Sequence, residues 1–299
     1  MENLGFIVNA DKARAKDALC RAAALASKLG LTLYAEPETA ALADVIASWR
    51  LCSVRELAVK CEAIAILGGD GTLLRAVHRL GRTDAVLMGL NIGSLGYLTG
   101  VEECRFEEAI RALAEDDVEI SERQMLSCRI RRTAMGHRDF EPPLQRPALN
   151  EAVISRRSGH LVRIALALDD VPVTEYACDG LIISTPTGST AYSLSAGGPL
   201  VMPGTAATVI TVICPHALSS RPLVVSSGTT ISLRLISSDT PLSLDIDGES
   251  SALIHPGDEV EIFRNEQRAR IAFLPDYNCY QTLNRKLGWS GSAEGSAKQ

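Results

Sequence analysis

One run of residues constrains the fold more than any other. It is the continuous apolar segment Ala63-Ile64-Ala65-Ile66-Leu67, which ends directly in Gly68-Gly69-Asp70-Gly71-Thr72. A strand without polar residues is typical of a sheet that is covered on both faces, as parallel sheets flanked by helices are. Apolar residues then recur at helical spacing at Leu73, Leu74, Val77 and Leu80. The segment therefore predicts a strand, a tight glycine loop and a helix, the repeating unit of α/β proteins.

The rest of the first 122 residues repeats this alternation of strand and helix. Apolar runs at 4–8, 31–35 and 85–90 are the other expected strands, and the alanine-rich stretch from about Asp11 to Leu29 is the first expected helix. We therefore expect residues 1–122 to form a doubly wound, Rossmann-like α/β domain.

From about Arg123 the period of the apolar residues changes to two. Alternating apolar residues lie at 126, 128 and 130, at 164, 166 and 168, at 260 and 262, and, beyond a polar turn at Asn265-Glu266, at 269, 271 and 273. This pattern predicts strands with one buried face. We expect residues 123–275 to form an antiparallel β-sandwich domain, so the predicted fold class is α/β plus all-β.

Three further segments complete the expected organisation. Residues 134–147 hold three prolines and few apolar residues, which predicts a hairpin loop. Residues 276–289 include a short last helix, expected from Tyr277 to Leu287. Residues 290–299 are Gly, Ser, Ala and charged residues, and are expected to be disordered.

Composition limits the class of protein. The 299 residues are 46% hydrophobic, enough for a large core, and the net charge of -6 argues against general attraction to nucleic acid. Eight scattered cysteines without metal-ligand spacing predict small core residues in a reducing cytosol. The first eight residues fit neither a signal peptide nor a spanning helix. We expect a cytoplasmic protein without nucleic-acid or membrane partners.

The acid in the glycine loop indicates a chemical task. Glycines at a strand end let backbone N–H groups approach a phosphate, and a helix N-terminus favours anions. Because Asp70 would repel bare phosphates, it predicts either binding of a divalent cation or acceptance of a proton from an attacking hydroxyl. The alternative is that Asp70 only caps the following helix. The loop is not a Walker A motif, since the chain has no Gly-Lys pair.

A second glycine segment follows the next expected strand, at 89–99. In a parallel sheet it would lie beside the first loop, and two adjacent strand-end loops predict a phosphate cradle. The alternative is a flexible turn ahead of a helix.

Five segments together resemble the NAD kinase family. They are Gly68-Gly69-Asp70-Gly71-Thr72, Asn91 to Thr99, Asn150-Glu151, Asp179 to Ser193 and Pro215 to Leu223. The resemblance spans nearly the whole chain, to Lys286-Leu287-Gly288-Trp289. It implies an N-terminal α/β domain, a C-terminal β domain, NAD lying between them, and a last helix that returns to the N-terminal domain. The implied reaction transfers the γ-phosphoryl of ATP to the 2′-hydroxyl of the adenosine ribose of NAD, which makes NADP.

The resemblance also assigns site residues. Asp70 matches the proton acceptor of the family and is the implied catalytic residue. The implied NAD-binding residues are Asp70, Gly71, Asn150, Glu151, His160, Asp179, Thr190, Ala191, Tyr192, Ser193, Leu194, Ser195 and Glu249. The residues expected to hold the ATP phosphates are Gly68, Gly69, Gly71 and Thr72. Ala177 stands where some relatives carry Lys or Arg.

Cofactor and partners follow from the same reaction. A divalent cation, Mg²⁺, would screen the phosphate charge, with no protein residue assigned as a metal ligand. ATP and NAD are the expected small-molecule partners. A homo-oligomer, dimer or tetramer, is expected.

Several alternatives stay open at this point. Asn150 and Glu151 suit ribose hydroxyls, but adjacent strand residues face opposite ways, so one must lie at a strand end or bulge; otherwise the pair is a solvated strand edge. Ser189 or Thr190 could cap a helix, with Tyr192 in the core. Rival functions are a lipid or sugar kinase that shares only the glycine loop, and a non-catalytic NAD sensor, which would tolerate loss of Asp70.

Overall fold

The computed structural model describes residues 1–43, 49–93, 96–133 and 140–289. The chain divides into two compact units. The first, called the α/β unit, comprises Met1–Ser121 and the segment from Arg270 onward, and the second, called the β unit, comprises Glu122–Ala269. The expected disordered tail, 290–299, lies outside the described residues.

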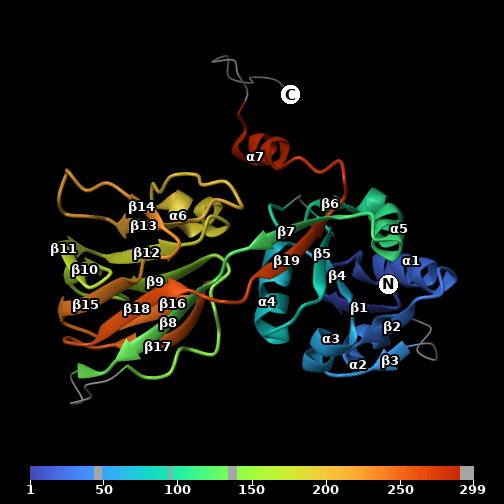
Figure 1. Cartoon of the computed structure of the whole chain (residues 1–299), viewed down its shortest axis with the longest axis horizontal. Helices are drawn as coiled ribbons and strands as arrows, with labels where there is room; N and C mark the ends of the chain where they lie inside the picture. The colour runs from blue at the N-terminus through green and yellow to red at the C-terminus, as the bar shows by residue number, and fades with distance from the viewer. Residues whose placement is uncertain (44–48, 94–95, 134–139, 290–299) are drawn as a thin grey trace. The chain divides into compact units, whose positions relative to one another are not determined.

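The α/β unit is built on one sheet with the strand order β3-β2-β1-β4-β5-β19-β7, and β6 pairs with β5 (Figure 1). Its strands are β1 (Asn3–Val8), β2 (Thr32–Ala35), β3 (Trp49–Leu51), β4 (Ala63–Gly68), β5 (Val86–Asn91), β6 (Val101–Glu102), β7 (Glu119–Arg123) and β19 (Ala269–Phe273). The pairs from β3 through β5 are all parallel. The chain runs outward from β1 to β3 and then returns to β4, which confirms the doubly wound prediction.

The last strand of this sheet corrects the expected domain boundary. Residues 269–273 were expected to continue the antiparallel β domain, but β19 pairs parallel with β5, with Ile271 opposite Leu87. Ile271, Ala272 and Phe273 are all buried. Alternation of apolar residues shows that one face of a strand is buried, but it does not show which strand lies beside it. The pattern in 269–273 therefore fits a strand of the α/β unit as well as one of the β unit. The β unit therefore ends at Ala269, not at 275.

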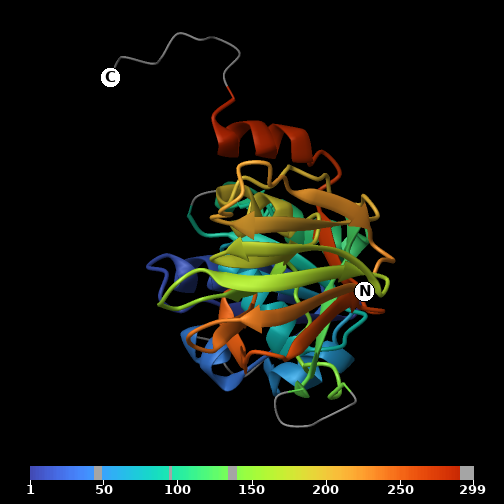
Figure 2. The same ribbon diagram turned by 90° about the vertical axis from the view of Figure 1, so that its left-hand side faces the viewer.

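The β unit consists of two antiparallel sheets (Figure 2). One has the order β11-β10-β15-β18-β8 and the other β14-β13-β12-β9-β16-β17. The strands are β8 (Leu126–Arg131), β9 (Glu151–Ser155), β10 (Val162–Leu168), β11 (Val171–Cys178), β12 (Gly180–Ser184), β13 (Ala207–Ile213), β14 (Leu223–Ser226), β15 (Ile231–Ser237), β16 (Leu242–Ile246), β17 (Glu249–Ile254) and β18 (Glu259–Arg264). One buried cluster takes residues from both sheets, among them Ile164 and Ile183. This confirms the sandwich.

Between β8 and β9, residues 140–147 carry no helix or strand. The first part of the predicted hairpin loop, 134–139, lies outside the described residues.

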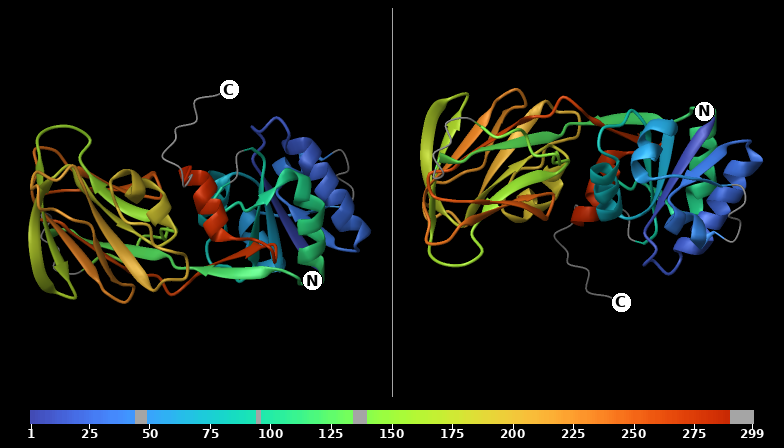
Figure 3. Two further views of the ribbon diagram at one scale, coloured as in Figure 1. Left: turned by 90° about the horizontal axis from the view of Figure 1, so that it is seen from above. Right: turned by 90° about the horizontal axis from the view of Figure 1, so that it is seen from below.

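Helices cover both faces of the α/β sheet. They are α1 (Ala15–Lys28), α2 (Pro37–Leu42), α3 (Val54–Lys60), α4 (Asp70–Leu80) and α5 (Phe106–Glu115), with the 3-10 turn η2 (Glu103–Arg105) before α5. Helices α1 and α5 run alongside each other (Figure 3) and share a core with Leu4 and Phe6 of β1. Gly5, which faces the other way, lies against Leu57 of α3. Burial on both faces explains why β4 is apolar throughout.

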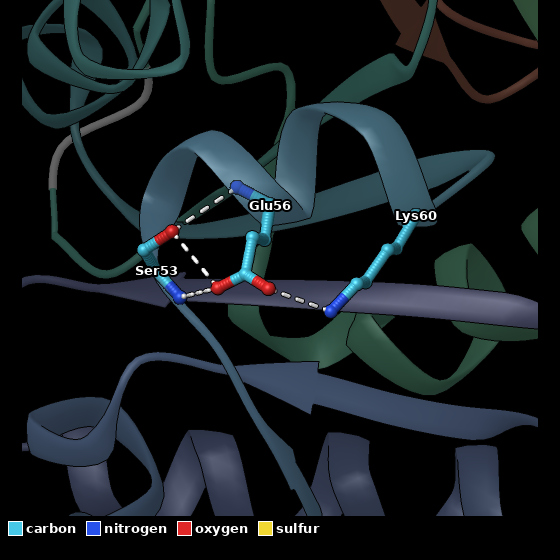
Figure 4. Close-up of polar contacts among 3 residues, drawn as sticks. All are labelled: Ser53, Glu56 and Lys60. Carbon is cyan, nitrogen blue, oxygen red and sulfur yellow. Dashed lines mark hydrogen bonds and ion pairs between the residues drawn. The ribbon is translucent and has the colours of Figure 1, made fainter.

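Helix α3 shows how local sequence sets a helix start. Ser53 and Glu56 form a capping box, in which the Ser53 hydroxyl accepts from the Glu56 N–H at 3.3 Å and Glu56 accepts from the Ser53 N–H at 2.9 Å (Figure 4). Lys60, one turn later, donates to Glu56 at 2.8 Å. The Lys60 ammonium and the Ser53 donors lower the pKa of Glu56 to about 2.

The last helix, α7 (Cys279–Leu287), begins at Asn278, whose side chain accepts from the N–H groups of Tyr280 and Gln281. Lys286 lies over the ring of Tyr97 at 5.4 Å, and Arg285 pairs with Glu102 at 3.0 Å, so α7 contacts the segment that follows β5. No helix in the described ranges has the length and apolar character to cross a membrane.

Candidate active site

The glycine loop of the α/β unit lies where the winding of the sheet reverses. Strands β1 and β4 are neighbours, and the chain leaves them in opposite directions. Asn9, directly after β1, donates its N–H to the Leu67 carbonyl at 2.9 Å and its amide to the Thr72 hydroxyl at 3.4 Å. Directly after β5, the Ile92 N–H donates to the Gly68 carbonyl at 3.0 Å. Open α/β sheets bind ligands at this crevice.

The glycines of this loop have different reasons to lack a side chain. A Cβ on Gly68 would stand 2.3 Å from the Thr72 hydroxyl, so this glycine lets α4 pack closely on its strand. A Cβ on Gly69 or Gly71 would meet nothing within 4 Å. The positions that face open space are the ones a phosphate group can approach. Thr72 is buried, and its hydroxyl points to Asn9.

Asp70 is the first residue of α4, and its carboxylate binds the second glycine segment. Its Oδ2 accepts from the Tyr97 N–H at 2.7 Å, and its Oδ1 accepts from the N–H groups of Leu98 and Thr99, both at 3.0 Å. The Thr99 hydroxyl donates to Oδ1 at 2.9 Å. The two loops are therefore adjacent, as predicted. The capping interpretation is wrong, since Gly69 is the N-cap and α4 has no side-chain cap.

The Asp70 carboxylate is held in one orientation and keeps acceptor capacity. Among the described residues, Oδ1 accepts from three donors and Oδ2 from one, which leaves Oδ2 able to accept another hydrogen bond. Two residues of the second glycine segment, Ser94 and Leu95, lie outside the described residues. The geometry provides an oriented acceptor at a helix N-terminus, next to open glycine positions.

In the β unit, three strand ends converge around Asn150 and Glu151. Strand β9 begins at Glu151, antiparallel to β12 and β16, so its start lies beside the ends of both neighbours. Asn150 precedes the strand, which meets the condition that one of the pair lie at a strand end. The strand-edge alternative is wrong, because β9 is an interior strand and Glu151 is only 6% exposed.

Glu151 is a buried carboxyl in an unfavourable environment for charge. Its Oε2 is buried and has no hydrogen-bond partner among the described residues. Burial, and then the charge of Asp247, raise the pKa of Glu151 to about 8, while a backbone N–H of Tyr192 acts in the opposite direction. A buried carboxyl with a free oxygen at a strand end is typical of a binding site.

The segment after β12 folds into a 3-10 turn, η4 (Gly188–Thr190), and the short helix α6 (Tyr192–Ser195). Neither has a side-chain cap, so the capping alternative for Ser189 or Thr190 is wrong. Tyr192 is 46% exposed and is not a core residue. Ser193 is buried and bonds the Thr211 hydroxyl at 2.9 Å, whereas Ser195 is exposed and Thr190, Ala191 and Leu194 are half-buried.

Of the remaining expected residues, Glu249 lies at the same end of the sheet as Glu151, because Ile246 pairs with both Ala152 and Glu249, whereas Asp179 and His160 lie at the other end. Asp179 precedes β12 at the opposite end from Thr185, about 17 Å away for a five-residue strand, and accepts from Arg156 at 2.7 Å. His160 is exposed in the loop that follows Arg156. Glu249, at the start of β17, is exposed and pairs with Arg146. Ala177 lies on β11 directly opposite Arg163 of β10.

Two residues that the sequence did not single out belong to these sites. Asn9 joins the glycine loop, and its signal is a polar residue directly after an apolar strand. Asp247 contacts the Asn150 loop, and its signal, an Asp-Gly pair, indicates only a hairpin turn.

A doubly wound unit with an oriented acid among glycines, followed in the chain by a β unit with a buried polar site, fits the class of nucleotide-binding phosphotransferases. Family models agree in both halves: the ATP-NAD kinase N-terminal domain matches residues 4–118 and the ATP-NAD kinase C-terminal domain matches residues 149–273. The chain therefore belongs to the NAD kinase family.

Relatives and solved structures agree with this membership. The NAD kinase of Photobacterium profundum is 37% identical over 80% of this chain and 80% of its own, and that of Symbiobacterium thermophilum is 39% identical over 76% and 78%. An Archaeoglobus fulgidus NAD kinase in complex with ATP superposes with a TM-score of 0.73 at 26% identity, over 96% of this chain and 98% of that one. Yeast NADH kinase complexed with NADH superposes with a TM-score of 0.88, over 100% of this chain and 90% of that one. At 22% sequence identity, this likeness supports the fold alone.

Proposed function

We propose that this chain transfers the γ-phosphoryl of ATP to the 2′-hydroxyl of the adenosine ribose of NAD, with Asp70 as the proton acceptor. A ribose hydroxyl is a weak nucleophile at neutral pH, and a carboxylate within hydrogen-bond reach can take its proton as the new P–O bond forms. The proton moves to Asp70, and the leaving group is ADP. The observation that carries this assignment is the oriented Asp70 carboxylate with acceptor capacity left on Oδ2.

The ATP phosphates belong at the N-terminus of α4. Gly68, Gly69, Gly71 and Thr72 form the loop there, and the open positions of Gly69 and Gly71 let backbone N–H groups reach phosphate oxygens. Because Thr72 is buried, its part is to hold the loop through Asn9 and Gly68. Phosphoryl transfer asks mainly for such positioning and charge neutralisation.

NAD belongs to the β unit by the same proposal. Asn150 and Glu151 are placed to bind ribose hydroxyls, and the exposed ring of Tyr192 to pack against a base. Asp179 and His160 lie at the other end of β12, which suits an elongated ligand. The remaining proposed contacts are Asp70, Gly71, Thr190, Ala191, Ser193, Leu194, Ser195 and Glu249.

A divalent cation, Mg²⁺, fits this chemistry as a companion of the nucleotide. The described residues contain no group of three or more His, Cys, Asp or Glu that could hold a metal. Mg²⁺ commonly keeps several waters and binds through substrate phosphates with one or two carboxylates. When bound, it would neutralise charge on the phosphates.

The test is NADP formation by the purified chain from NAD, ATP and Mg²⁺. We expect turnover with Mg²⁺ and none after chelation with EDTA, while the melting temperature of the free protein stays unchanged, because the metal arrives with ATP. Absence of NADP with any divalent metal or phosphoryl donor would overturn the proposed activity. A large drop of the melting temperature in EDTA would instead indicate a protein-bound metal.

Gly96 gives a prediction about the position of Asp70. A Cβ there would stand 1.8 Å from Asp70 Oδ1 and 2.4 Å from the Thr99 hydroxyl. We expect Gly96→Ala to lower kcat for NADP formation about a hundredfold, because a displacement of about 1 Å of a catalytic group costs that much. Gly228→Ala is the control, since its nearest neighbour would be 3.8 Å away. Normal kcat in folded Gly96→Ala would refute the tight fit.

We further propose a cytoplasmic homo-oligomer, dimer or tetramer, without nucleic-acid or membrane partners. The net charge of -6 supports the absence of general nucleic-acid binding. Sedimentation of the purified chain measures the assembly, and a monomer across micromolar concentrations would contradict it.

A further inference from the structure

The hairpin between β16 and β17 holds the backbone on which Asn150 and Glu151 stand. The carboxylate of Asp247 accepts from three consecutive N–H groups: Oδ2 from Leu149 at 2.8 Å, and Oδ1 from Asn150 at 2.8 Å and from Glu151 at 2.9 Å. The Asp247 N–H in turn donates to the Glu151 carbonyl at 3.0 Å. One aspartate therefore satisfies the backbone donors of all three residues from Leu149 to Glu151.

The carbonyls of the same loop are held from the other side by Thr185, the residue after β12. The Thr185 hydroxyl donates to the Leu149 carbonyl at 2.7 Å, and its N–H donates to the Asn150 carbonyl at 2.8 Å. A Cβ at Gly188 would stand 2.2 Å from the Asn150 carbonyl oxygen, so the contact is close. With the main chain held on both sides, the side chains of Asn150 and Glu151 do not have to stabilise the loop.

The turn alone does not require an aspartate. Asp247 has φ +49° and Gly248 φ +80°, a two-residue hairpin that Asn or Gly would form equally well. Only a carboxylate can accept three N–H donors without offering one of its own. The identity of this residue is therefore explained by the loop that it contacts.

We propose that Asp247 is a positioning residue for NAD: its carboxylate fixes the Leu149–Glu151 backbone so that Asn150 and Glu151 present their side chains to the dinucleotide. This rests on the proposed role of Asn150 and Glu151 in NAD binding. Asp247 acts through these residues and not on the reacting atoms. Its loss therefore weakens NAD binding and leaves the ATP site, in the α/β unit, as it is.

Asp169 offers a matched control in the same unit. It also lies in a two-residue hairpin, between β10 and β11, with φ +48°. Its carboxylate accepts from the Thr230 N–H at 2.8 Å, and its own N–H donates to the Thr230 carbonyl at 2.9 Å. Like Asp247, it lies in a two-residue turn and exchanges hydrogen bonds with the backbone of another segment, but it accepts from one N–H group and has no hydrogen bond to Asn150 or Glu151.

The experiment compares Asp247→Gly and Asp247→Asn with Asp169→Gly. Glycine keeps the left-handed turn and removes the carboxylate. We expect Asp247→Gly to raise KM for NAD about tenfold or more, because NAD must then order the side chains of Asn150 and Glu151 as it binds. KM for ATP should stay within about twofold of the parent value. Asp247→Asn, which keeps one acceptor oxygen, should give a smaller rise. Asp169→Gly should leave both KM values unchanged.

Two results would overturn the positioning role. One is an unchanged KM for NAD in folded Asp247→Gly, and the other is an equal rise in Asp169→Gly, which would indicate general loss of stability. Calorimetric titration of each variant with NAD separates this inference from the proposed activity. If the parent binds NAD but forms no NADP, the proposed kinase activity is refuted. The titration then still tests whether Asp247 positions the NAD-binding residues.

Discussion

Asp70→Asn should lower kcat for NADP formation between about a hundredfold and ten-thousandfold, the range that a positioned proton acceptor contributes. Asn has the shape of Asp but cannot take the proton of the ribose hydroxyl. Affinity for NAD, measured by titration calorimetry, should stay within a few-fold, because the other proposed contacts remain. The measurement is steady-state turnover with saturating NAD, ATP and Mg²⁺.

A second variant separates proton transfer from support of the loop. Asn at position 70 also places an amide where Asp70 accepts from the backbone of residues 97–99, so part of the loss could come from a loosened segment. Thr99→Val removes only the hydroxyl that donates to Oδ1 at 2.9 Å and keeps the carboxylate. We expect it to lower kcat less than about tenfold. If Thr99→Val lowers kcat as much as Asp70→Asn does, the main role of Asp70 is to hold residues 97–99 in place. If Asp70→Asn keeps full turnover, Asp70 is not the base.

Glu151→Gln should make the protein more stable at pH 8 than its parent. The pKa of Glu151 is raised from its ordinary value of 4.5 to about 8, by burial first and then by the charge of Asp247. Between these two values the folded state keeps a proton that the unfolded chain releases, so stability falls as pH rises through this window. Each pH unit costs about 1.4 kcal/mol. Gln has no proton to lose, so its advantage should grow to a few kcal/mol by pH 8.

Urea unfolding of both proteins at pH 5, 6.5 and 8 measures this difference. The parent should lose stability more steeply than Glu151→Gln across the series, and the two should be close at pH 5. Glu175→Gln, which changes a half-exposed carboxylate of the same unit, is the control and should follow the parent. Parallel curves for parent and Glu151→Gln would mean that Glu151 titrates normally. Glu151→Gln should also bind NAD more weakly than the parent, because binding-site residues often lower the stability of the protein in exchange for function.

The sequence predicted the local elements of the fold well, and its site residues stay predictions. The apolar run of β4, the helical spacing after Gly71 and the period-two strands are confirmed, because each pattern reports which faces of an element are buried. Family motifs supplied Asp70 and the Asn150-Glu151 pair. The alternation of side chains alone implied that one of the pair lies at a strand end or bulge, and β9 begins at Glu151, directly after Asn150.

Other features depended on partners distant in the chain. The alternation in 269–273 fits either sheet, and only pairing with β5 placed it in the α/β unit. The Asp247-Gly248 pair indicates only a local turn, whereas the three N–H groups that donate to Asp247 lie about a hundred residues earlier. A solvated strand edge stayed open for Glu151 from the sequence, and only the pairing of β9 with β12 and β16 on its two sides excluded it.

The glycine loop shows the same division. The sequence by itself determined that an acid stands among glycines between a buried strand and a helix, since residue type and spacing are local properties. Only the tertiary structure decided what the acid does with its oxygens: it leaves its own helix uncapped and accepts from residues 97–99, which β5 brings beside it. The physical reason is that a carboxylate binds whichever donors the fold places within reach, and strand pairing, not nearby sequence, places them.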